Sequence, residues 1–398
     1  MFEMHADEVL GVLRDGRPRT KSELAEELGK VRSTISLRLA ELIEAGLVTQ
    51  LQGSTSTKGR APAMFALATD ARIIGAVALT SDSAVVALTD LIGTVLDRRD
   101  LEVPEDASLT DLVRLASATL LDLLDGLGRS AGDLVGIGVG VPGPVDPAES
   151  AVGEAQRPPA NGRHPAVALL QQEFPVRVIV DNEANVATVG EWVESWAELE
   201  NLIMVTVSAR IDAGIIASAG LIRGADGGAG SIGHIRVPVD EPRLCRCGQL
   251  GCLETIASGS GLVQTLSSEG RDVHTTDDVV ALVRSGDPAA VLAVREAGRA
   301  LGTVLAGVAA TLNPSAIVLG GDVAQVGEPL LAGIREAVYG LSQPLTTNSL
   351  RIAIARNLEL ASIVGASRLV QNSLFGVPRR PVVYYRPEPT PARAYART

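Results

Sequence analysis

All three cysteines of this 398-residue chain lie within the stretch Cys245-Arg-Cys247-Gly-Gln-Leu-Gly-Cys252, and His234 precedes the first of them by eleven residues. An odd number of closely spaced cysteines suits a metal site better than a disulfide framework. Three thiolates and one imidazole match a closed structural zinc site, and the two glycines between the cysteines allow the tight backbone that such clustering needs. Two alternatives stay open: a reduced loop without metal, and a catalytic zinc, which four protein ligands disfavour because they leave no open position.

The composition limits the class of protein further. With 46% hydrophobic and 21% charged residues, the chain can bury a sizeable core, and its length predicts two or three domains. A net charge of -12 argues against a protein that coats nucleic acid over its whole surface, although one small domain can still be basic. The first residues are partly acidic and lack the apolar core of a secretory signal, so we expect a cytoplasmic protein.

One long uncharged run, residues 300 to 321, has the length of a membrane span. Asn313-Pro314 splits this run, and glycine and threonine dilute its apolar character. We therefore expect a buried helix followed by a buried strand, and no membrane partner.

Residues 7 to 67 show the pattern of three helices followed by a hairpin. Thr20 and Glu23 form a capping box that opens the middle helix, and Gly29 can end it. The next helix is predicted to bury its apolar residues, which recur at helical spacing: Ile35, Leu39, Leu42 and Ile43. Two apolar runs, residues 47 to 51 and 63 to 67, flank a loop rich in serine, threonine and glycine, which predicts a two-stranded wing.

This segment is locally basic. Residues 29 to 62 carry five basic and two acidic side chains, a net charge of +3 in an otherwise acidic chain. The segment resembles the winged helix-turn-helix heads of bacterial repressors, whose second helix enters the major groove of DNA. The alternative is an ordinary small helical domain with an exposed basic face. The predicted DNA contacts are Arg32, Ser33, Thr34, Ser36, Leu37 and Arg38 in the helix, and Lys58 and Arg60 in the wing.

From about residue 72 the chain alternates strand-like apolar runs with helical stretches, which predicts an α/β body. One buried strand ends in Pro142-Gly143-Pro144. The predicted strands are residues 73 to 79, 83 to 88, 134 to 141, 176 to 180, 202 to 207, 214 to 218 and 317 to 319. The predicted helices are residues 109 to 127 and 288 to 312.

Three blocks of this body carry a family resemblance. They are Gly230-Ser-Ile-Gly-His234 with the cysteine loop and Leu253-Glu254 behind it, the glycine-rich run from residue 136 to residue 146, and Asp181-Asn-Glu-Ala-Asn185. Together, over residues 72 to 375, they resemble the ROK family of repressors, open reading frames and sugar kinases. The resemblance implies an actin-like, hexokinase-like (ribonuclease H-like) body of two α/β lobes, with a sugar site in the cleft and a dimeric or tetrameric assembly.

These observations predict four segments along the chain. The helix near residues 360 to 375 is expected to complete the first lobe of the body. The segments are a winged helix-turn-helix domain at 1 to 70, a first α/β lobe at 71 to 185, a second α/β lobe with the zinc loop at 186 to 359, and an irregular tail at 376 to 398.

The resemblance also argues against kinase activity. Family kinases carry Asp-x-Gly-Gly-Thr, whose glycines let backbone amides approach phosphate oxygens, but this chain has Val77-Ala-Leu-Thr-Ser81. The family's second phosphate loop, Gly-Thr-Gly-x-Gly, is replaced by Ser208-Ala-Arg-Ile-Asp212. Glu183 stands where the family has its catalytic aspartate, so we assign no catalytic residue. The loss of both phosphate loops predicts a protein that does not transfer phosphate.

The family's sugar-facing residues are better retained, although Ser231 replaces one glutamate and removes one carboxylate clamp. His234 has two predicted roles, with one ring nitrogen on zinc and the other directed toward a ligand or a second acceptor. The alternative for each polar residue is an ordinary hydrogen bond inside a cleft. The sugar-facing residues implied by the resemblance are Asn161, Asn182, Glu183, His234 and Glu254.

The combined prediction is a transcriptional regulator, of the repressor branch, that binds operator DNA and responds to a sugar or sugar phosphate. A homodimer or homotetramer and a structural zinc ion are part of this prediction. Two alternatives stay open: an ATP-dependent sugar kinase with a DNA-binding head, and a regulator of this family that has lost its sugar ligand.

Overall fold

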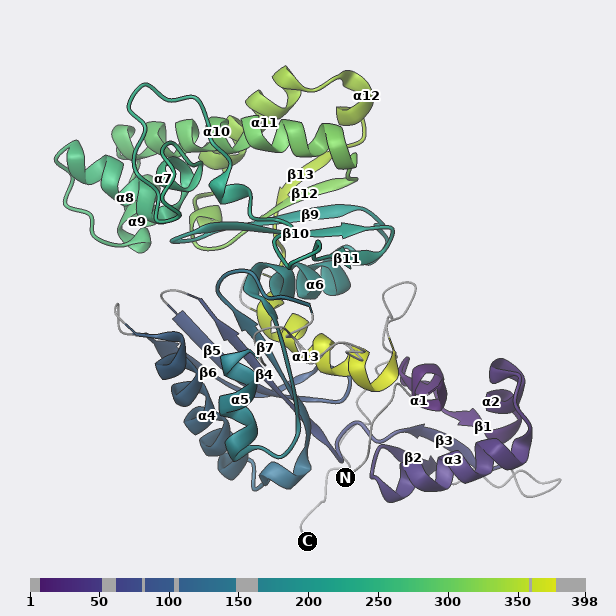
Figure 1. Cartoon of the computed structure of the whole chain (residues 1–398). Coiled ribbons are helices and arrows are strands. Elements are labelled where there is room, and N and C mark those ends of the chain that lie inside the picture. Colours follow the sequence, from purple (N-terminus) through teal and green to yellow (C-terminus); the bar gives the residue numbers. More distant parts are fainter. Residues whose placement is uncertain are drawn as a thin grey trace, which may run out of the picture. The chain divides into compact units, whose positions relative to one another are not determined.

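The computed structural model describes residues 8–51, 62–80, 83–103, 107–147, 164–357 and 360–376. Two compact units divide the described chain: a head, residues 8–72 with 371–376, and a body, residues 73–370 (Figure 1). The predicted fold class, a winged helix-turn-helix followed by a two-lobed α/β body, is confirmed. Within the described ranges, every helix is too short or too polar to span a bilayer.

The head is built as a winged helix-turn-helix. Its three short strands form one antiparallel sheet in the order β1-β3-β2. The capping box at Thr20 is present, and Gly29 ends the second helix in the left-handed conformation at φ 62°. The elements of the head are α1 (Glu8–Leu13), β1 (Arg19–Thr20), α2 (Lys21–Leu28), α3 (Arg32–Glu44), β2 (Val48–Leu51) and β3 (Met64–Leu67).

The buried face of α3 is narrower than the sequence pattern predicts. Ile35, Leu39 and Leu42 are buried as expected, but Ile43 is 39% exposed, so the prediction for Ile43 is wrong. These three buried residues form the stripe of α3 that faces the core of the head, and Ile43 lies at the edge of this stripe.

Residues 371–376 complete the head from the far end of the chain. Arg14 of α1 donates hydrogen bonds to the Gly376 carbonyl oxygen at 2.6 Å and to Asn372 Oδ1 at 3.3 Å. The Arg14 guanidinium also lies 5.6 Å from the ring centroid of Phe375. The head is therefore assembled from both ends of the chain.

The first lobe of the body is a five-stranded sheet in the order β6-β5-β4-β7-β8, in which β4, β7 and β8 are parallel. Helices α4 (Leu109–Gly126) and α5 (Pro165–Glu173) pack on one face (Figure 1). The charged edge strand β6 was not predicted, because its sequence does not alternate between apolar and polar residues. The strands are β4 (Ile73–Leu79), β5 (Ser83–Asp90), β6 (Val95–Glu102), β7 (Leu134–Val141) and β8 (Arg177–Asn182).

Helix α13 (Ala361–Phe375) packs on the other face of this sheet, directly over the glycines of β7. A Cβ atom added to Gly138 would lie 1.9 Å from the Ala366 carbonyl oxygen, and one added to Gly136 would lie 2.9 Å from Val370. The alternating glycines are therefore required by the close approach of α13. Residues of α13 up to Val370 belong to the body, and those from Gln371 onward belong to the head.

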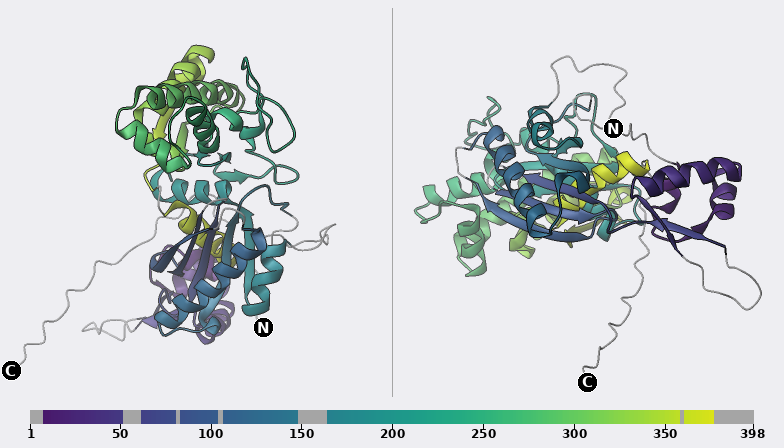
Figure 2. Two further views of the ribbon diagram at one scale, coloured as in Figure 1. Left: turned by 90° about the vertical axis from the view of Figure 1, so that its left-hand side faces the viewer. Right: turned by 90° about the horizontal axis from the view of Figure 1, so that it is seen from below.

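The second lobe is a five-stranded sheet in the order β11-β10-β9-β12-β13. Helices α8 (Gly259–Ser268), α9 (Thr276–Arg284), α10 (Pro288–Leu312) and α11 (Glu328–Leu341) cover one face (Figure 2). As predicted, the long uncharged run is a helix and a strand, because α10 ends before Asn313, which has φ 44°. The strands are β9 (Leu202–Val207), β10 (Ile211–Ala217), β11 (Gly220–Ile222), β12 (Ala316–Gly320) and β13 (Arg351–Ile354).

Helix α6 (Glu183–Ser195) contacts both sheets and follows β8 without an intervening loop. Asn182 is its N-cap, because Asn182 Oδ1 accepts a hydrogen bond from the Asn185 amide. A Cβ atom added to Gly214 of β10 would lie 2.1 Å from Thr188 Oγ1, so α6 lies tightly against the second sheet. This arrangement places the start of α6 where the two lobes meet.

Candidate functional site

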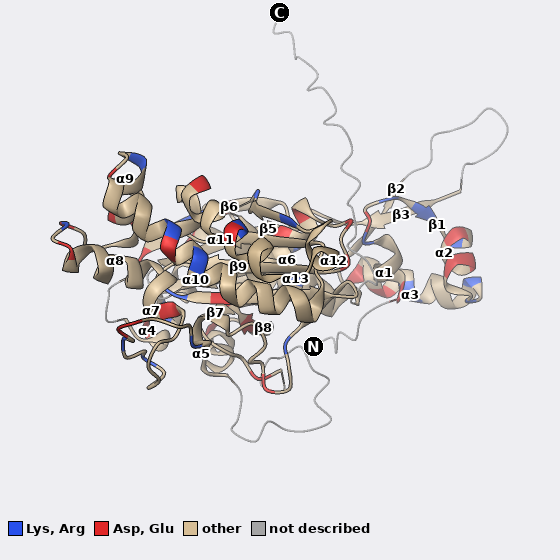
Figure 3. Ribbon diagram, turned by 90° about the horizontal axis from the view of Figure 1, so that it is seen from above, with Lys and Arg blue, Asp and Glu red and all other residues tan. Residues whose placement is uncertain are grey.

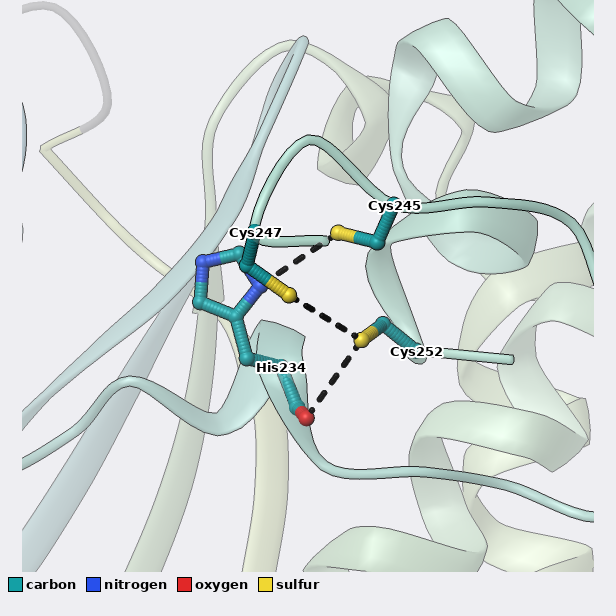
Figure 4. Close-up of side chains that lie close together, drawn as sticks. All are labelled: His234, Cys245, Cys247 and Cys252. Atoms are coloured by element: carbon teal, nitrogen blue, oxygen red, sulfur yellow. Dashed lines mark hydrogen bonds between the residues drawn. The ribbon is translucent and has the colours of Figure 1, made fainter. Parts of the chain in front are cut away.

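The four predicted metal ligands lie together in the second lobe (Figure 4). Their ligand atoms all lie within 4.8 Å of one another. Cys245 Sγ is 3.5 Å from His234 Nδ1, and Cys247 Sγ is 3.6 Å from Cys252 Sγ. A tetrahedral zinc ion, with bonds of about 2.3 Å to sulfur and about 2.0 Å to nitrogen, sets its ligand atoms about 3.5–3.8 Å apart. The cluster therefore fits a single tetrahedral ion.

Tight turns bring the three thiols of this cluster together. Gly248 and Gly251 have φ of 87° and 76°, a conformation that favours glycine. Cys252 and Cys245 are buried. Burial, together with the neighbouring thiols, raises the pKa of Cys252 to about 12, so without a cation this thiol stays protonated at neutral pH. A bound divalent cation would stabilise the deprotonated form instead, so the cysteines would bind it as thiolates.

The cysteine loop is hydrogen-bonded to Glu254, one of the predicted sugar-facing residues. Arg246, between two of the cysteines, donates from Nε to Glu254 Oε1 at 2.8 Å. The second oxygen of Glu254 accepts a longer hydrogen bond, 3.4 Å, from the Ile211 amide at the start of β10. Glu254 is only 7% exposed, so its carboxylate has a fixed position between the cysteine loop and the second sheet.

A small cavity of about 40 Å³ lies between the lobes and is lined by residues of both. Asn182 Nδ2 donates to the Gly143 carbonyl oxygen at 2.8 Å, and Ser362 Oγ donates to Glu183 Oε1 at 2.7 Å. The structure therefore places Asn182 and Glu183, two of the predicted sugar-facing residues, along the same cavity as residues of both altered phosphate loops. The lining comprises Thr80, Pro142, Gly143, Asn182, Glu183, Ala184, Thr206, Ser208, Arg210 and Asp212.

A larger cavity of about 930 Å³ shares Arg210 with the first and is lined by Arg246, Glu254 and His274 among others. Asp212 lies near this group of charges. Burial, with the negative charge of Glu254, raises the pKa of Asp212 to about 6. The cleft therefore gains one negative charge as the pH rises through about 6.

The predicted sugar-facing residues are only partly brought together. Asn182 and Glu183 line the small cavity, and Glu254 lines the large one. His234 lies in the cysteine cluster, and Asn161 lies outside the described residues.

An ion pair that sequence reasoning missed fixes the end of β8. Arg223, which follows β11, donates to Asp181 Oδ2 at 2.7 Å. Asp181 Oδ1 also accepts from the Asn182 amide at 2.8 Å and from Asn185 Nδ2 at 3.0 Å. Asp181 is 2% exposed, so this pair ties the second lobe to the buried start of the asparagine block. No local sequence signal could have identified Arg223, because 42 residues separate the two partners.

In the head, most of the predicted DNA-contacting residues of α3 face solvent. Arg32, Ser33, Thr34 and Leu37 are exposed, whereas Ser36 and Arg38 are half-buried. Arg38 Nη1 pairs with Glu41 at 2.6 Å. Acidic side chains concentrate on α2, and α3 has none in its first turn (Figure 3). Lys58 and Arg60 lie outside the described residues.

A helix-turn-helix head and a two-lobed body with a Cys3His cluster together define a regulator built on a sugar-kinase-like fold. The chain belongs to the ROK family: residues 74–373 match the family model described as "ROK family". In the head, residues 8–50 match the model "Bacterial regulatory protein, arsR family".

Curated relatives include both repressors and kinases. The xylose repressor of Caldicellulosiruptor bescii is 27% identical over 391 residues, which cover 93% of this chain and 96% of the relative. The glucokinase of Halalkalibacterium halodurans is 30% identical over 307 residues, covering 72% of this chain and 91% of the relative. A crystal structure of a ROK family transcriptional regulator, a homolog of the E. coli MLC protein, superposes with a TM-score of 0.75 at 22% identity, over 93% of this chain and 95% of that chain.

Proposed function

We infer that the protein is a DNA-binding transcriptional repressor that responds to a sugar or a sugar phosphate. The observation that carries this conclusion is the similarity to the xylose repressor, which extends over head and body together. The match to the glucokinase, by contrast, covers only 72% of this chain, which is about the length of the body without the head. A ligand in the cleft can control the head only if it binds two conformations of the protein with different affinities.

Three further properties belong to this proposal. The Cys3His cluster holds a structural zinc ion, supported by the spacing of its ligand atoms. Asn182, Glu183 and Glu254 contact the effector, supported by their place along the two cavities. The protein acts as a homodimer or homotetramer, since helix-turn-helix proteins read two half-sites about one helical turn apart.

Sugar phosphorylation is the second candidate function, favoured by the glucokinase relative. The geometry of the altered loops argues against it. Leu79, at the first glycine position, is fully buried within β4, and the amide of Thr80, at the second, donates to the Ser83 carbonyl oxygen at 2.9 Å. Asp212, within the altered second loop, places a carboxylate on the small cavity, where it repels the negative charge of a transferred phosphate.

A direct assay separates the two candidates. Purified protein with magnesium and ATP should produce no sugar phosphate from glucose, xylose or N-acetylglucosamine, because both phosphate-binding loops lack their glycines. Coupled ADP release and mass spectrometry of the sugars measure this. Turnover above that of a protein-free control would establish the kinase and contradict a purely regulatory body.

Arg32→Ala should weaken specific DNA binding by about 5- to 150-fold, the factor that about 1–3 kcal/mol per good base contact gives. Gel-shift titration of a duplex selected from a random pool measures this. Arg17→Ala is the matched control, because Arg17 is an equally charged, 72% exposed side chain of the head outside α3. An equal loss in both variants would mean that α3 makes no specific contact and only charge matters.

Glu254→Ala should weaken sugar binding by about 5- to 150-fold without lowering the DNA affinity of the ligand-free protein. Thermal shifts with xylose, glucose, N-acetylglucosamine and N-acetylglucosamine 6-phosphate measure the first effect, and gel shifts measure the second. Glu269→Ala, an exposed glutamate after α8, is the control. Silence of the unaltered protein against this panel would favour the regulator that has lost its ligand.

A further inference from the structure

Leu37 is an exposed leucine in the N-terminal half of α3. It has 66% of its surface exposed, while Ile35, Leu39 and Leu42 of the same helix are buried. Leu37 lies on the opposite face of the helix, so its side chain contributes little to the head's core. The head therefore gives no folding reason for an apolar side chain at this position.

The neighbours of Leu37 on the helix leave it accessible. Ser33 and Ala40, four residues before and three residues after it, lie on the same side of the helix and are small and exposed. Glu41, the nearest acidic residue in the helix, is neutralised by its ion pair with Arg38. The first turn of α3 contains no acidic residue and begins with exposed Arg32. This surface is apolar at its centre and compatible with the negative charge of DNA.

We propose that Leu37 reads the 5-methyl group of a thymine in the major groove of the operator. The inference rests on the DNA-binding function proposed above. Base edges in the major groove present hydrogen-bond donors and acceptors, and the thymine methyl is their distinctive apolar feature. A leucine against any other edge would remove water from polar atoms and return no hydrogen bond, which costs affinity. Leu37 thus specifies a T·A pair at one position of each half-site.

The test removes the methyl group without changing base pairing. Duplexes are first selected from a random pool by the unaltered protein, and each thymine of the best duplex is then replaced by uracil. One position per half-site should lose about fourfold in affinity, the factor given by about 0.8 kcal/mol for one buried methyl-sized group. With Leu37→Ala, the same replacement should have no effect.

Ile43→Ala is the matched control, because Ile43 is a second exposed apolar side chain at the far end of the same helix. It should keep the sensitivity to uracil, and Leu37→Ala should melt at the temperature of the unaltered protein, because the Leu37 side chain is 66% exposed. Equal uracil sensitivity with and without the Leu37 side chain overturns the proposal, as does a selected duplex without any methyl-sensitive position. Failure of the pool to enrich any sequence overturns the DNA-binding function itself, which is a distinguishable result.

Discussion

Cys252→Ser is expected to abolish metal binding and to lower the melting temperature of the protein by about 10 °C. Cys252 is fully buried and is one of the four predicted ligands of the Cys3His cluster, and serine supplies no thiolate to complete the tetrahedron. Metal binding to such a site is coupled to folding, and a loss of roughly 3 kcal/mol gives a shift of this size in a domain of about 150 to 250 residues. Elemental analysis should fall from about one zinc per chain to none.

Gln249→Ala is the control for this experiment, because Gln249 is an exposed residue of the same loop that supplies no predicted ligand. It should keep both the metal and the melting temperature. Full thermal stability of the metal-free Cys252→Ser protein would contradict a structural role for zinc. Weakened sugar binding in the same variant would follow from the Arg246 to Glu254 contact, since the loop that carries Arg246 loosens.

Asp181→Ala should destabilise the body by about 2–4 kcal/mol, a fall of roughly 5–15 °C in melting temperature. The substitution removes a buried carboxylate that accepts hydrogen bonds from Arg223, Asn182 and Asn185. It leaves the guanidinium of Arg223 without this partner. Because the Arg223 side chain is 27% exposed, water compensates for part of the loss, and the upper limit for a fully buried pair does not apply.

The matched control is Asp122→Ala, which breaks a surface ion pair with Arg99 at 3.2 Å. Both side chains of that pair are about half or more exposed, so its loss should cost less than about 1 kcal/mol. Thermal melting and denaturant titration measure both variants. Equal destabilisation by the two substitutions would show that the buried pair contributes no more than a surface pair.

Local patterns predicted much of this fold. The alternation of apolar runs located β4, β7, β9 and α10, and the break at Asn313 separated a helix from a strand. These features depend on residues close together in the sequence, so hydrophobic periodicity and turn residues are sufficient to identify them. The spacing of the cysteines identified their cluster for the same reason.

Contacts between distant parts of the chain could not be predicted in this way. Nothing near Glu183 indicates that Ser362 hydrogen-bonds to it, and nothing near Asp181 indicates Arg223. The glycines of β7 were visible as a motif, but their physical cause, the close approach of α13, depends on a segment more than two hundred residues away. The cleft therefore required the structure, because tertiary packing decides which polar side chains meet there.

The head is built from two segments that lie far apart in the sequence, and this has a consequence for protein synthesis. Residues 371–376 are synthesised after the whole body, so a nascent chain exposes all six head elements long before the segment that holds Arg14 exists. A prematurely terminated product that ends before Asn372 would display α3 without the hydrogen bonds and aromatic ring that complete its domain. The head can therefore be completed only after the body has been synthesised, so its final packing comes later than its position at the start of the sequence indicates.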